Sequence, residues 1–344
     1  MGNFDLLLSI FWLFVELGCI SVCLATLAGF LGRISWVLDL FSHFRFQYLV
    51  LLALLTILFI ASGRYPQALL SGLFAGLNLS LILPLYSKEF IRTPSNQGSS
   101  DQEMYRILLS NVLQMNDAYG AVRHLIRSER PDFIVLIEVN KTWIDQLKPV
   151  LESYPFSRMP LREDNYGMAL FSRIPPTISE VRAFGAAQVP SIITTFKLRK
   201  RPLTILVTHP PPPKTKQKAH LRNIQLAEIA KHIQTLEGEI LLVGDLNMTS
   251  WSPFFSDLVQ KSGLRDSRRG FGIQNSWPTN RRLFMIPIDH ILVSKGVEVL
   301  SRRIGQFNGS DHYPILLDFY LIDRKVNPQP EKKDPIKQTI NRSG

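Results

Sequence analysis

The sequence predicts an α/β domain preceded by three membrane-spanning helices. Two observations support this division: long uncharged apolar runs fill residues 1–90, and short apolar strands alternate with helical stretches over residues 105–321. Between them, residues 91–104 are polar and contain Ser, Pro and Gly, which is typical of a flexible linker. Residues 322–344 have little apolar content, and we expect a disordered tail.

The membrane prediction depends on three runs. Residues 6–31 are interrupted by Glu16 alone, and residues 47–62 and 67–86 carry no charge. A helix of about 20 apolar residues spans a bilayer, so the chain is expected to be a multi-pass protein of the cell membrane, in contact with membrane lipid. The alternative is a buried helical hairpin in a soluble protein.

Charge is distributed unevenly along the chain. Residues 1–90 hold four acidic and four basic side chains, so the formal net charge of +11 lies on residues 91–344. A basic domain favours anionic partners such as nucleic acid, phospholipid headgroups or other phosphate esters, and nothing in the sequence indicates a protein partner. Both cysteines, Cys19 and Cys23, fall in the first apolar run, which excludes thiol catalysis from the α/β domain.

The strand at residues 238–247 suggests where the chemistry takes place. A buried apolar run is followed by Gly244-Asp245-Leu246-Asn247, so two polar side chains stand at the carboxyl end of a strand, where open α/β sheets place their active sites. The simpler interpretation is an Asx turn in which Asp245 and Asn247 bond nearby backbone.

Further strands show the same feature. Strands are expected at 105–112, 132–138, 166–173, 191–198, 202–209, 286–294 and towards residue 319, and helices at 117–130, 216–237 and 252–260. Three of these strands end at Asn111, Glu138 and His209, and Asp289 opens another. A glutamate after five apolar strand residues is costly to desolvate, so Glu138 needs a cation or several hydrogen-bond donors.

Together these residues resemble a known family. The order of the motifs is that of the endonuclease/exonuclease/phosphatase superfamily: Asn111, Glu138, Tyr166-Gly167, Ser172-Arg173, Thr208-His209, Gly244-Asp245-x-Asn247, Ile288-Asp289-His290 and Gly309-Ser310-Asp311-His312. The resemblance covers residues 105–321 and implies a DNase I-like four-layer α/β sandwich. Residues 276–279 and the prolines after His209 are most similar to the membrane-anchored bacterial branch of the family.

The resemblance implies Mg²⁺ as cofactor, with Mn²⁺ as a substitute. Asn111 and Glu138 offer the oxygen ligands that Mg²⁺ accepts, and the family pattern adds Asp311. Hydrolysis of a phosphate ester needs such a cation, an aligned water and stabilisation of developing negative charge.

The remaining site residues are assigned to the reaction itself. Asp245 is expected to orient or deprotonate the attacking water, and Asn247 to donate to the phosphoryl group. His312, held by Asp289, is expected to contact a phosphoryl oxygen or share proton transfer, and His209 to donate near the leaving oxygen. His290 is expected to point to the opposite face of its strand, although the competing interpretation makes it the catalytic imidazole.

The resulting hypothesis is a membrane-anchored, Mg²⁺-dependent phosphohydrolase acting on a lipid-linked phosphate or a phosphodiester. The alternatives are a membrane-tethered DNA or RNA endonuclease or exonuclease, and a catalytically inactive anion-binding module. Arg33, Arg45, Lys88 and Arg92 flank the spans on the side of the domain, and this excess favours a cytoplasmic domain. Some members of the bacterial branch resemble extracytoplasmic phosphatases that act on lipid-linked phosphates, so the side of the membrane stays open.

Overall fold

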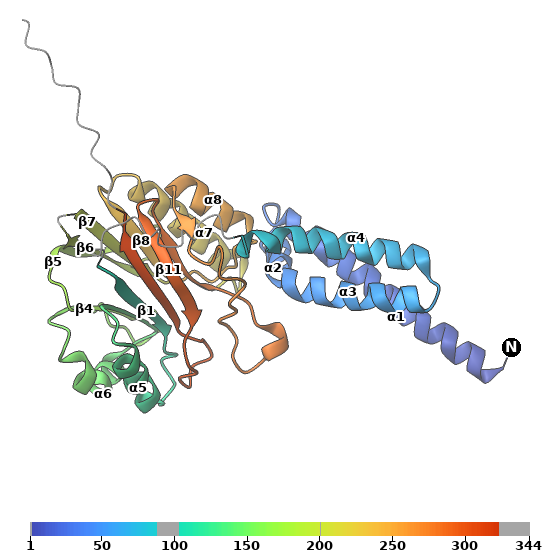
Figure 1. Cartoon of the computed structure of the whole chain (residues 1–344), viewed down its shortest axis with the longest axis horizontal. Helices are drawn as coiled ribbons and strands as arrows, with labels where there is room; N and C mark the ends of the chain where they lie inside the picture. The colour runs from blue at the N-terminus through green and yellow to red at the C-terminus, as the bar shows by residue number, and fades with distance from the viewer. Residues whose placement is uncertain (1, 88–102, 200, 323–344) are drawn as a thin grey trace, which may run out of the picture.

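The computed structural model describes residues 2–87, 103–199 and 201–322 (Figure 1). Within these ranges a helical region extends away from one edge of a two-sheet domain. Apart from residues 103 and 104, the expected linker at 91–104 lies outside the described residues, and so does the expected tail from residue 323.

The helical region contains three helical stretches long and apolar enough to cross a membrane: Phe4–Leu31, Trp36–Ala61 and Tyr65–Leu85. Their main helices are α1 (Asn3–Ala28), α3 (Arg45–Ala61) and α4 (Tyr65–Ile82). A short helix, α2 (Trp36–Phe41), lies between α1 and α3. Glu16, the one charge in the first run, accepts hydrogen bonds from Arg64 at 2.5 Å and Gln67 at 2.9 Å. This carboxylate of the first candidate span is therefore paired with residues at the start of α4.

Two six-stranded sheets form the domain. The first has the order β11 (Val297–Ile304), β12 (Ile315–Leu321), β1 (Tyr105–Asn111), β2 (Phe133–Ile137), β4 (Met168–Ser172) and β3 (Phe156–Arg158). The second has the order β5 (Pro176–Ala183), β6 (Pro190–Leu198), β7 (Arg201–Thr208), β8 (Glu239–Asp245), β10 (Asp289–Val293) and β9 (Arg265–Asp266). Their inner faces form one continuous apolar core that includes Leu109, Val135, Val207, Val243 and Ile291.

Helices cover the outer faces of both sheets. α5 (Tyr119–Glu129) and α6 (Lys141–Leu151) pack on the first sheet, and α7 (Lys216–Ile233) and α8 (Pro253–Ser262) on the second. As expected, Ser252 caps α8, and its hydroxyl accepts from the Phe254 N–H. The expected four-layer α/β sandwich is therefore confirmed.

Strand direction brings the expected site residues to one edge of the sandwich. β1 runs parallel to β2, and β7 parallel to β8, so the carboxyl ends of each pair meet. β10 runs antiparallel to β8, and its first residue, Asp289, lies opposite Asp245. We call this edge the catalytic edge.

The same edge contacts the helical region. The Leu85 carbonyl at the end of the third span accepts from the N–H groups of Gly270 and Gly272, at 2.8 and 2.9 Å. The Trp251 indole donates to the Leu81 carbonyl at 3.2 Å. The domain thus docks directly on the ends of the spans.

Candidate active site

A cleft of about 300 Å³ opens at the catalytic edge. Six expected site residues line it: Glu138, His209, Asp245, Asn247, Asp311 and His312. Asn111 and Asp289, each 1% exposed, lie behind this lining and hydrogen-bond to it. The structure therefore brings together all eight residues that the sequence assigned to the site.

Asp245 occupies the centre of this group. Its Oδ1 accepts from the Asn247 N–H at 2.9 Å, so the Asx turn does exist. Its Oδ2 faces the cleft, 3.3 Å from Asn111 Nδ2 and 3.6 Å from His209 Nε2. One carboxylate therefore both closes the turn and presents an oxygen to the site, and the two interpretations of the motif are compatible.

Two backbone features shape this turn. A Cβ at Gly244 would lie 1.8 Å from the Thr208 carbonyl oxygen, so only glycine allows β8 to approach β7 this closely. Asn247 has a φ of 52°, a left-handed conformation that asparagine tolerates better than most residues. Its Nδ2 donates to the Pro210 carbonyl at 3.0 Å.

The His312 imidazole pairs with Asp289. Its Nδ1 lies 2.8 Å from Asp289 Oδ2, and both side chains are buried. Burial alone would lower the pKa of His312, but the Asp289 carboxylate outweighs it and raises the pKa to about 10. The pKa of Asp289 falls below its usual range because the charged imidazole outweighs the opposite effect of burial. The ring is therefore an imidazolium at neutral pH, with Nε2 turned towards Asp245 at 3.7 Å.

His209 and Asp245 are shifted in the directions that disfavour charge. Burial lowers the pKa of His209 to about 4, and the nearby positive charge of His312 adds to this. Burial raises the pKa of Asp245 to about 8, and the Asp289 carboxylate adds to that shift. The two imidazoles of the cleft thus differ in charge at neutral pH.

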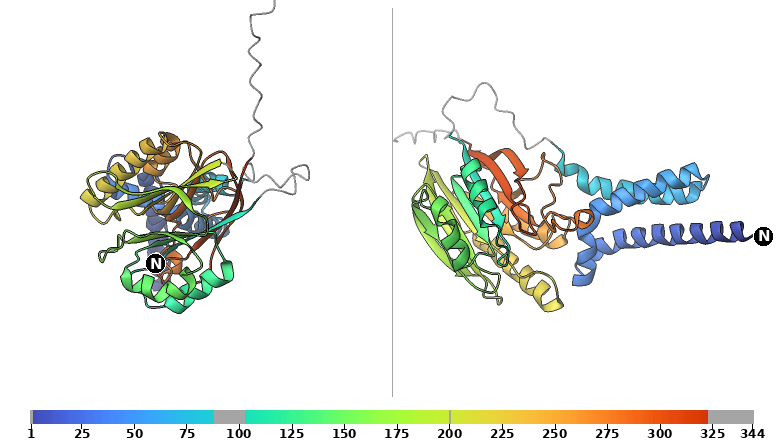
Figure 2. Two further views of the ribbon diagram at one scale, coloured as in Figure 1. Left: turned by 90° about the vertical axis from the view of Figure 1, so that its left-hand side faces the viewer. Right: turned by 90° about the horizontal axis from the view of Figure 1, so that it is seen from below.

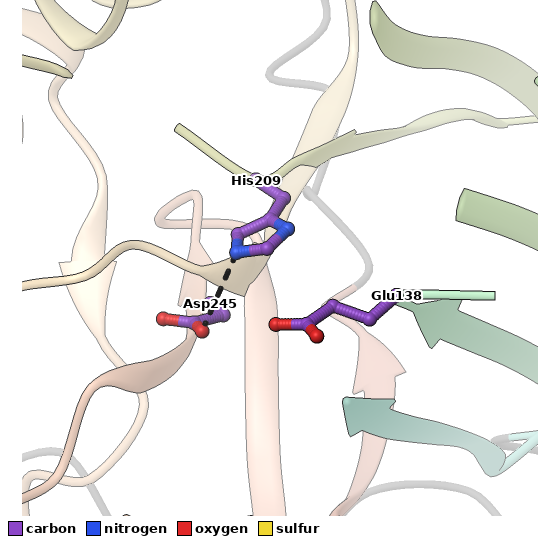
Figure 3. Close-up of side chains that lie close together, drawn as sticks. All are labelled: Glu138, His209 and Asp245. Carbon is purple, nitrogen blue, oxygen red and sulfur yellow. Dashed lines mark ion pairs between the residues drawn. The ribbon is translucent and has the colours of Figure 1, made fainter. Parts of the chain in front are cut away.

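Glu138, His209 and Asp245 converge on one point (Figure 3). One potential ligand atom from each of the three lies within 4.8 Å of the others. Glu138 follows β2 with a φ of 57°, and burial raises the pKa of its carboxyl group. This arrangement disfavours a bare carboxylate and is relieved by a cation.

Two buried oxygens test whether a divalent cation fits. Among the described residues, Glu138 Oε2 and Asp311 Oδ1 have no hydrogen-bond partner. Unpaired carboxylate oxygens of this kind suit a hard cation such as Mg²⁺. Asn111 is oriented differently: its Oδ1 accepts from the Leu113 N–H at 3.1 Å, and its Nδ2 donates to Glu138 at 3.0 Å. Its amide must rotate before its oxygen can join the ligand set.

His290 lies outside the cleft, as expected for its place on the strand. Its Nε2 is 2.8 Å from the Met248 carbonyl, and its ring packs on Phe255 with the centroids 4.7 Å apart. The competing assignment of His290 as the catalytic imidazole is therefore not supported by its position.

Several residues of the cleft were not assigned to the site from the sequence, although Tyr166 and residues 276–279 were noted as family motifs. Trp277 donates its indole N–H to Asp311 Oδ2 at 3.0 Å, and the Tyr166 ring lies 5.6 Å from that of His209. Lys214 and Lys218 stand exposed at the rim. The lysines follow the proline run after His209, so their position beside a predicted site residue was a usable signal.

Comparisons with known proteins agree with this geometry. Residues 98–312 match the model of the Endonuclease/Exonuclease/phosphatase family, which is more than half of the chain. A search of curated proteins finds no match.

Solved structures share the fold at low sequence identity. D. rerio TDP2 complexed with a single-strand DNA product has a TM-score of 0.55 and 17% identity, covering 63% of this chain and 99% of that one. The human Nocturnin catalytic domain with bound sulfate gives a TM-score of 0.53 and 19% identity, covering 64% and 97%. The endonuclease/exonuclease/phosphatase from Bacteroides vulgatus gives 0.53 and 18%, covering 64% and 100%.

The family match, the fold and the converging acidic and imidazole side chains lead to one conclusion. The chain belongs to the endonuclease/exonuclease/phosphatase family and is a metal-dependent hydrolase of phosphoric ester bonds.

Proposed function

We propose that the protein is a multi-pass membrane enzyme that uses Mg²⁺ to hydrolyse a phosphate ester carried by a membrane lipid. The observation that carries this proposal is the direction of the catalytic edge, whose loops contact the ends of the membrane-spanning helices. A substrate held in the bilayer therefore has its headgroup on the same side of the domain as the cleft.

The loops that line the cleft also carry the contacts with the spans. Residues 246–252, after β8, hold both Asn247 of the cleft and Trp251, which bonds Leu81. Residues 267–288, before β10, hold Trp277 of the cleft and Met285, whose carbonyl accepts from Gln47 at 2.8 Å. The cleft is therefore separated from the ends of the spans by single loops.

The side chains of the cleft are assigned separate roles. Glu138 and Asp311, with Asn111 after rotation of its amide, are proposed to hold the cation, which supplies positive charge to the phosphoryl oxygens. Asp245 Oδ2 is proposed to orient the attacking water, and to accept its proton because a bound cation would lower the raised pKa of this carboxyl group. The His312 imidazolium, fixed by Asp289, donates from Nε2 to a phosphoryl oxygen.

The remaining two polar groups are assigned to the substrate's ester. Asn247 donates to the phosphoryl group, which requires its amide to leave the Pro210 carbonyl. His209 is neutral at pH 7 and donates its ring N–H near the leaving oxygen. Lys214 and Lys218 at the rim attract the anionic headgroup.

A second candidate is a nuclease that acts on single-stranded nucleic acid. It is favoured by the basic charge of residues 91–344 and by the fold similarity to D. rerio TDP2, which is complexed with a single-strand DNA product. The catalytic edge argues against a long duplex, because the helical region adjoins it.

Turnover by the purified full-length protein in detergent separates these candidates. The substrates are phosphatidic acid, a lipid pyrophosphate, a chromogenic phosphodiester and single-stranded DNA, each with Mg²⁺, with Mn²⁺ and with EDTA. We expect cation-dependent turnover that is fastest on a lipid substrate. Faster turnover of DNA than of any lipid selects the nuclease, and no turnover of any substrate overturns both candidates.

A further inference from the structure

We propose that α2 and the turn after it, at the start of the second candidate span, are a positioning element of the active site, and that Asp39 acts through Arg222 on the loop that carries Asn247. The proposal rests on the function proposed above and assigns a catalytic contribution to residues outside the α/β domain. Asp39 lies in α2, and Arg222 in α7.

A buried ion pair connects the two parts of the chain. Asp39 Oδ2 accepts from Arg222 Nη2 at 2.8 Å, with the side chains 1% and 0% exposed. The cost of desolvating two charges offsets most of their attraction, so a buried ion pair adds little net stability. What it can do is fix the relative position of the two segments that it joins. Here the pair lies at the junction between the helical region and residues 246–252, which we call the catalytic loop.

Arg222 also hydrogen-bonds to the catalytic loop. Its Nη1 donates to the Asn247 main-chain carbonyl at 2.8 Å. The Asn247 N–H donates to Asp245 Oδ1. One peptide segment is therefore held from one side by a cleft carboxylate and from the other by a guanidinium whose counter-ion comes from the helical region.

The same short segment holds the rest of the loop. Asp39 Oδ1 accepts from the Ser252 hydroxyl at 2.7 Å, and His43 Nδ1 lies 3.0 Å from the Thr249 hydroxyl. Thr249 and Ser252 are buried. Residues 246–252 therefore contact Asp39 and His43 at two positions besides the one that Arg222 bridges.

This loop needs external support because of its conformation. The Asn247 backbone is in the left-handed region, with a φ of 52°, which costs free energy for a residue other than glycine. Such a conformation persists only where the surrounding structure fixes it. A charged donor on the Asn247 carbonyl fixes the peptide that follows the strained residue. Loss of the donor is expected to let the Asn247 backbone leave the position from which its side chain reaches the cleft, while the fold persists.

A more exposed ion pair at the same junction serves as a control. Arg33 donates two hydrogen bonds, each 2.7 Å long, to the Asp257 carboxylate. This pair also joins the helical region to the domain, but Asp257 lies in α8, and within the described residues its carboxylate hydrogen-bonds to Arg33 and to no residue of 246–252. Asp257→Asn therefore weakens the docking without removing support from Asn247.

The experiment measures kcat, KM and Tm for the full-length protein in detergent with Mg²⁺ and bis(para-nitrophenyl) phosphate. Its variants are Asp39→Asn, Arg222→Gln, the double variant and Asp257→Asn. Loss of a charged hydrogen bond predicts a kcat about 10- to 100-fold lower for Arg222→Gln, with KM changed less than about 3-fold. Asp39→Asn is expected to lower kcat about 10-fold, and Asp257→Asn to leave it unchanged.

The double variant separates positioning from folding. With neither charge buried alone, its Tm should exceed that of Asp39→Asn, but its kcat should stay as low as that of Arg222→Gln. If kcat recovers together with Tm, the pair is only structural and the proposal is wrong. Parental kcat in Arg222→Gln, or an equal loss in Asp257→Asn, also overturns it.

Hydrogen exchange gives a readout that does not need activity. The backbone amides of residues 245–252 should exchange faster in Asp39→Asn and Arg222→Gln than in the parent or in Asp257→Asn. If the parent protein hydrolyses no substrate, the proposed function fails, and the exchange rates still decide whether Asp39 holds the loop. Equal exchange in all variants contradicts that role.

Discussion

Asp289 and His312 should behave as one catalytic unit. They are 23 residues apart in sequence, and their carboxylate oxygen and ring nitrogen lie 2.8 Å apart. A charged hydrogen bond of this kind is worth about 1.5–3 kcal/mol, and about 1.4 kcal/mol corresponds to a tenfold change in rate. Asp289→Asn is therefore expected to lower kcat by about 10- to 100-fold.

His312→Ala removes both the charge and the donor itself. Loss of one preorganised donor to a developing oxyanion lowers kcat by about 10²–10³. If the two residues acted independently, the double variant would lose about 10³–10⁵. We expect it instead to lie within about 3-fold of His312→Ala, because Asp289 has no catalytic effect once the imidazole is absent.

The assay is turnover of a chromogenic phosphodiester at saturating Mg²⁺, with Tm recorded for each variant to confirm folding. His232→Gln is the control, because His232 lies at the end of α7, packed on Phe184 and outside the cleft. Turnover near the parental value in folded His312→Ala would refute the catalytic role of His312. If the losses of the two single variants multiply in the double variant, Asp289 and His312 act independently.

Three further predictions follow from the site and its surroundings. Glu138→Gln should lose activity at low Mg²⁺ and regain part of it at high Mg²⁺. It should also raise the Tm of the metal-free protein, because it removes a buried carboxylate whose pKa is raised. Unchanged activity at low Mg²⁺ would show that Glu138 does not bind the cation. Arg268 holds the pKa of buried Asp266 below its usual range against the effect of burial, so this carboxylate stabilises the fold above about pH 4 and less as pH falls. Asp266→Asn should therefore cost about 3–5 kcal/mol at pH 7 and flatten the acid limb of Tm against pH, and an unchanged acid limb would contradict the pairing. Replacing Lys214 and Lys218 together by Gln should raise KM about 3- to 10-fold at low salt with kcat retained. The control Lys148→Gln, in α6, should leave KM unchanged. A KM of the double lysine variant equal to that of the parent would show that the two lysines do not bind the substrate.

Strand ends were predictable from the sequence because the signal is local. Buried apolar runs that stop at Asn111, Glu138 and Asp245 define both the strand and the side chain that it delivers, and the parallel pairs then bring these ends together. The N-cap Ser252 is a local feature of the same kind.

Features that depend on tertiary contact could not be predicted this way. β5 begins at Pro176, and no strand was expected between residues 173 and 191; an edge strand tolerates proline at its first residue. Arg222 lies in a helix with charged neighbours and resembles any exposed arginine in sequence, yet it is fully buried. Its partner Asp39 is 183 residues away, and no local pattern connects the two.

The central claim is that the cleft acts on a phosphate ester in the membrane that holds the protein. Full-length protein is reconstituted with Mg²⁺ into vesicles that contain phosphatidic acid or a lipid pyrophosphate, and also into vesicles that lack it and are mixed with separate substrate vesicles. The account predicts turnover of a lipid substrate in the shared bilayer and about background turnover when the substrate is in separate vesicles. Equal rates in the two arrangements, or faster hydrolysis of single-stranded DNA than of either lipid, would contradict it.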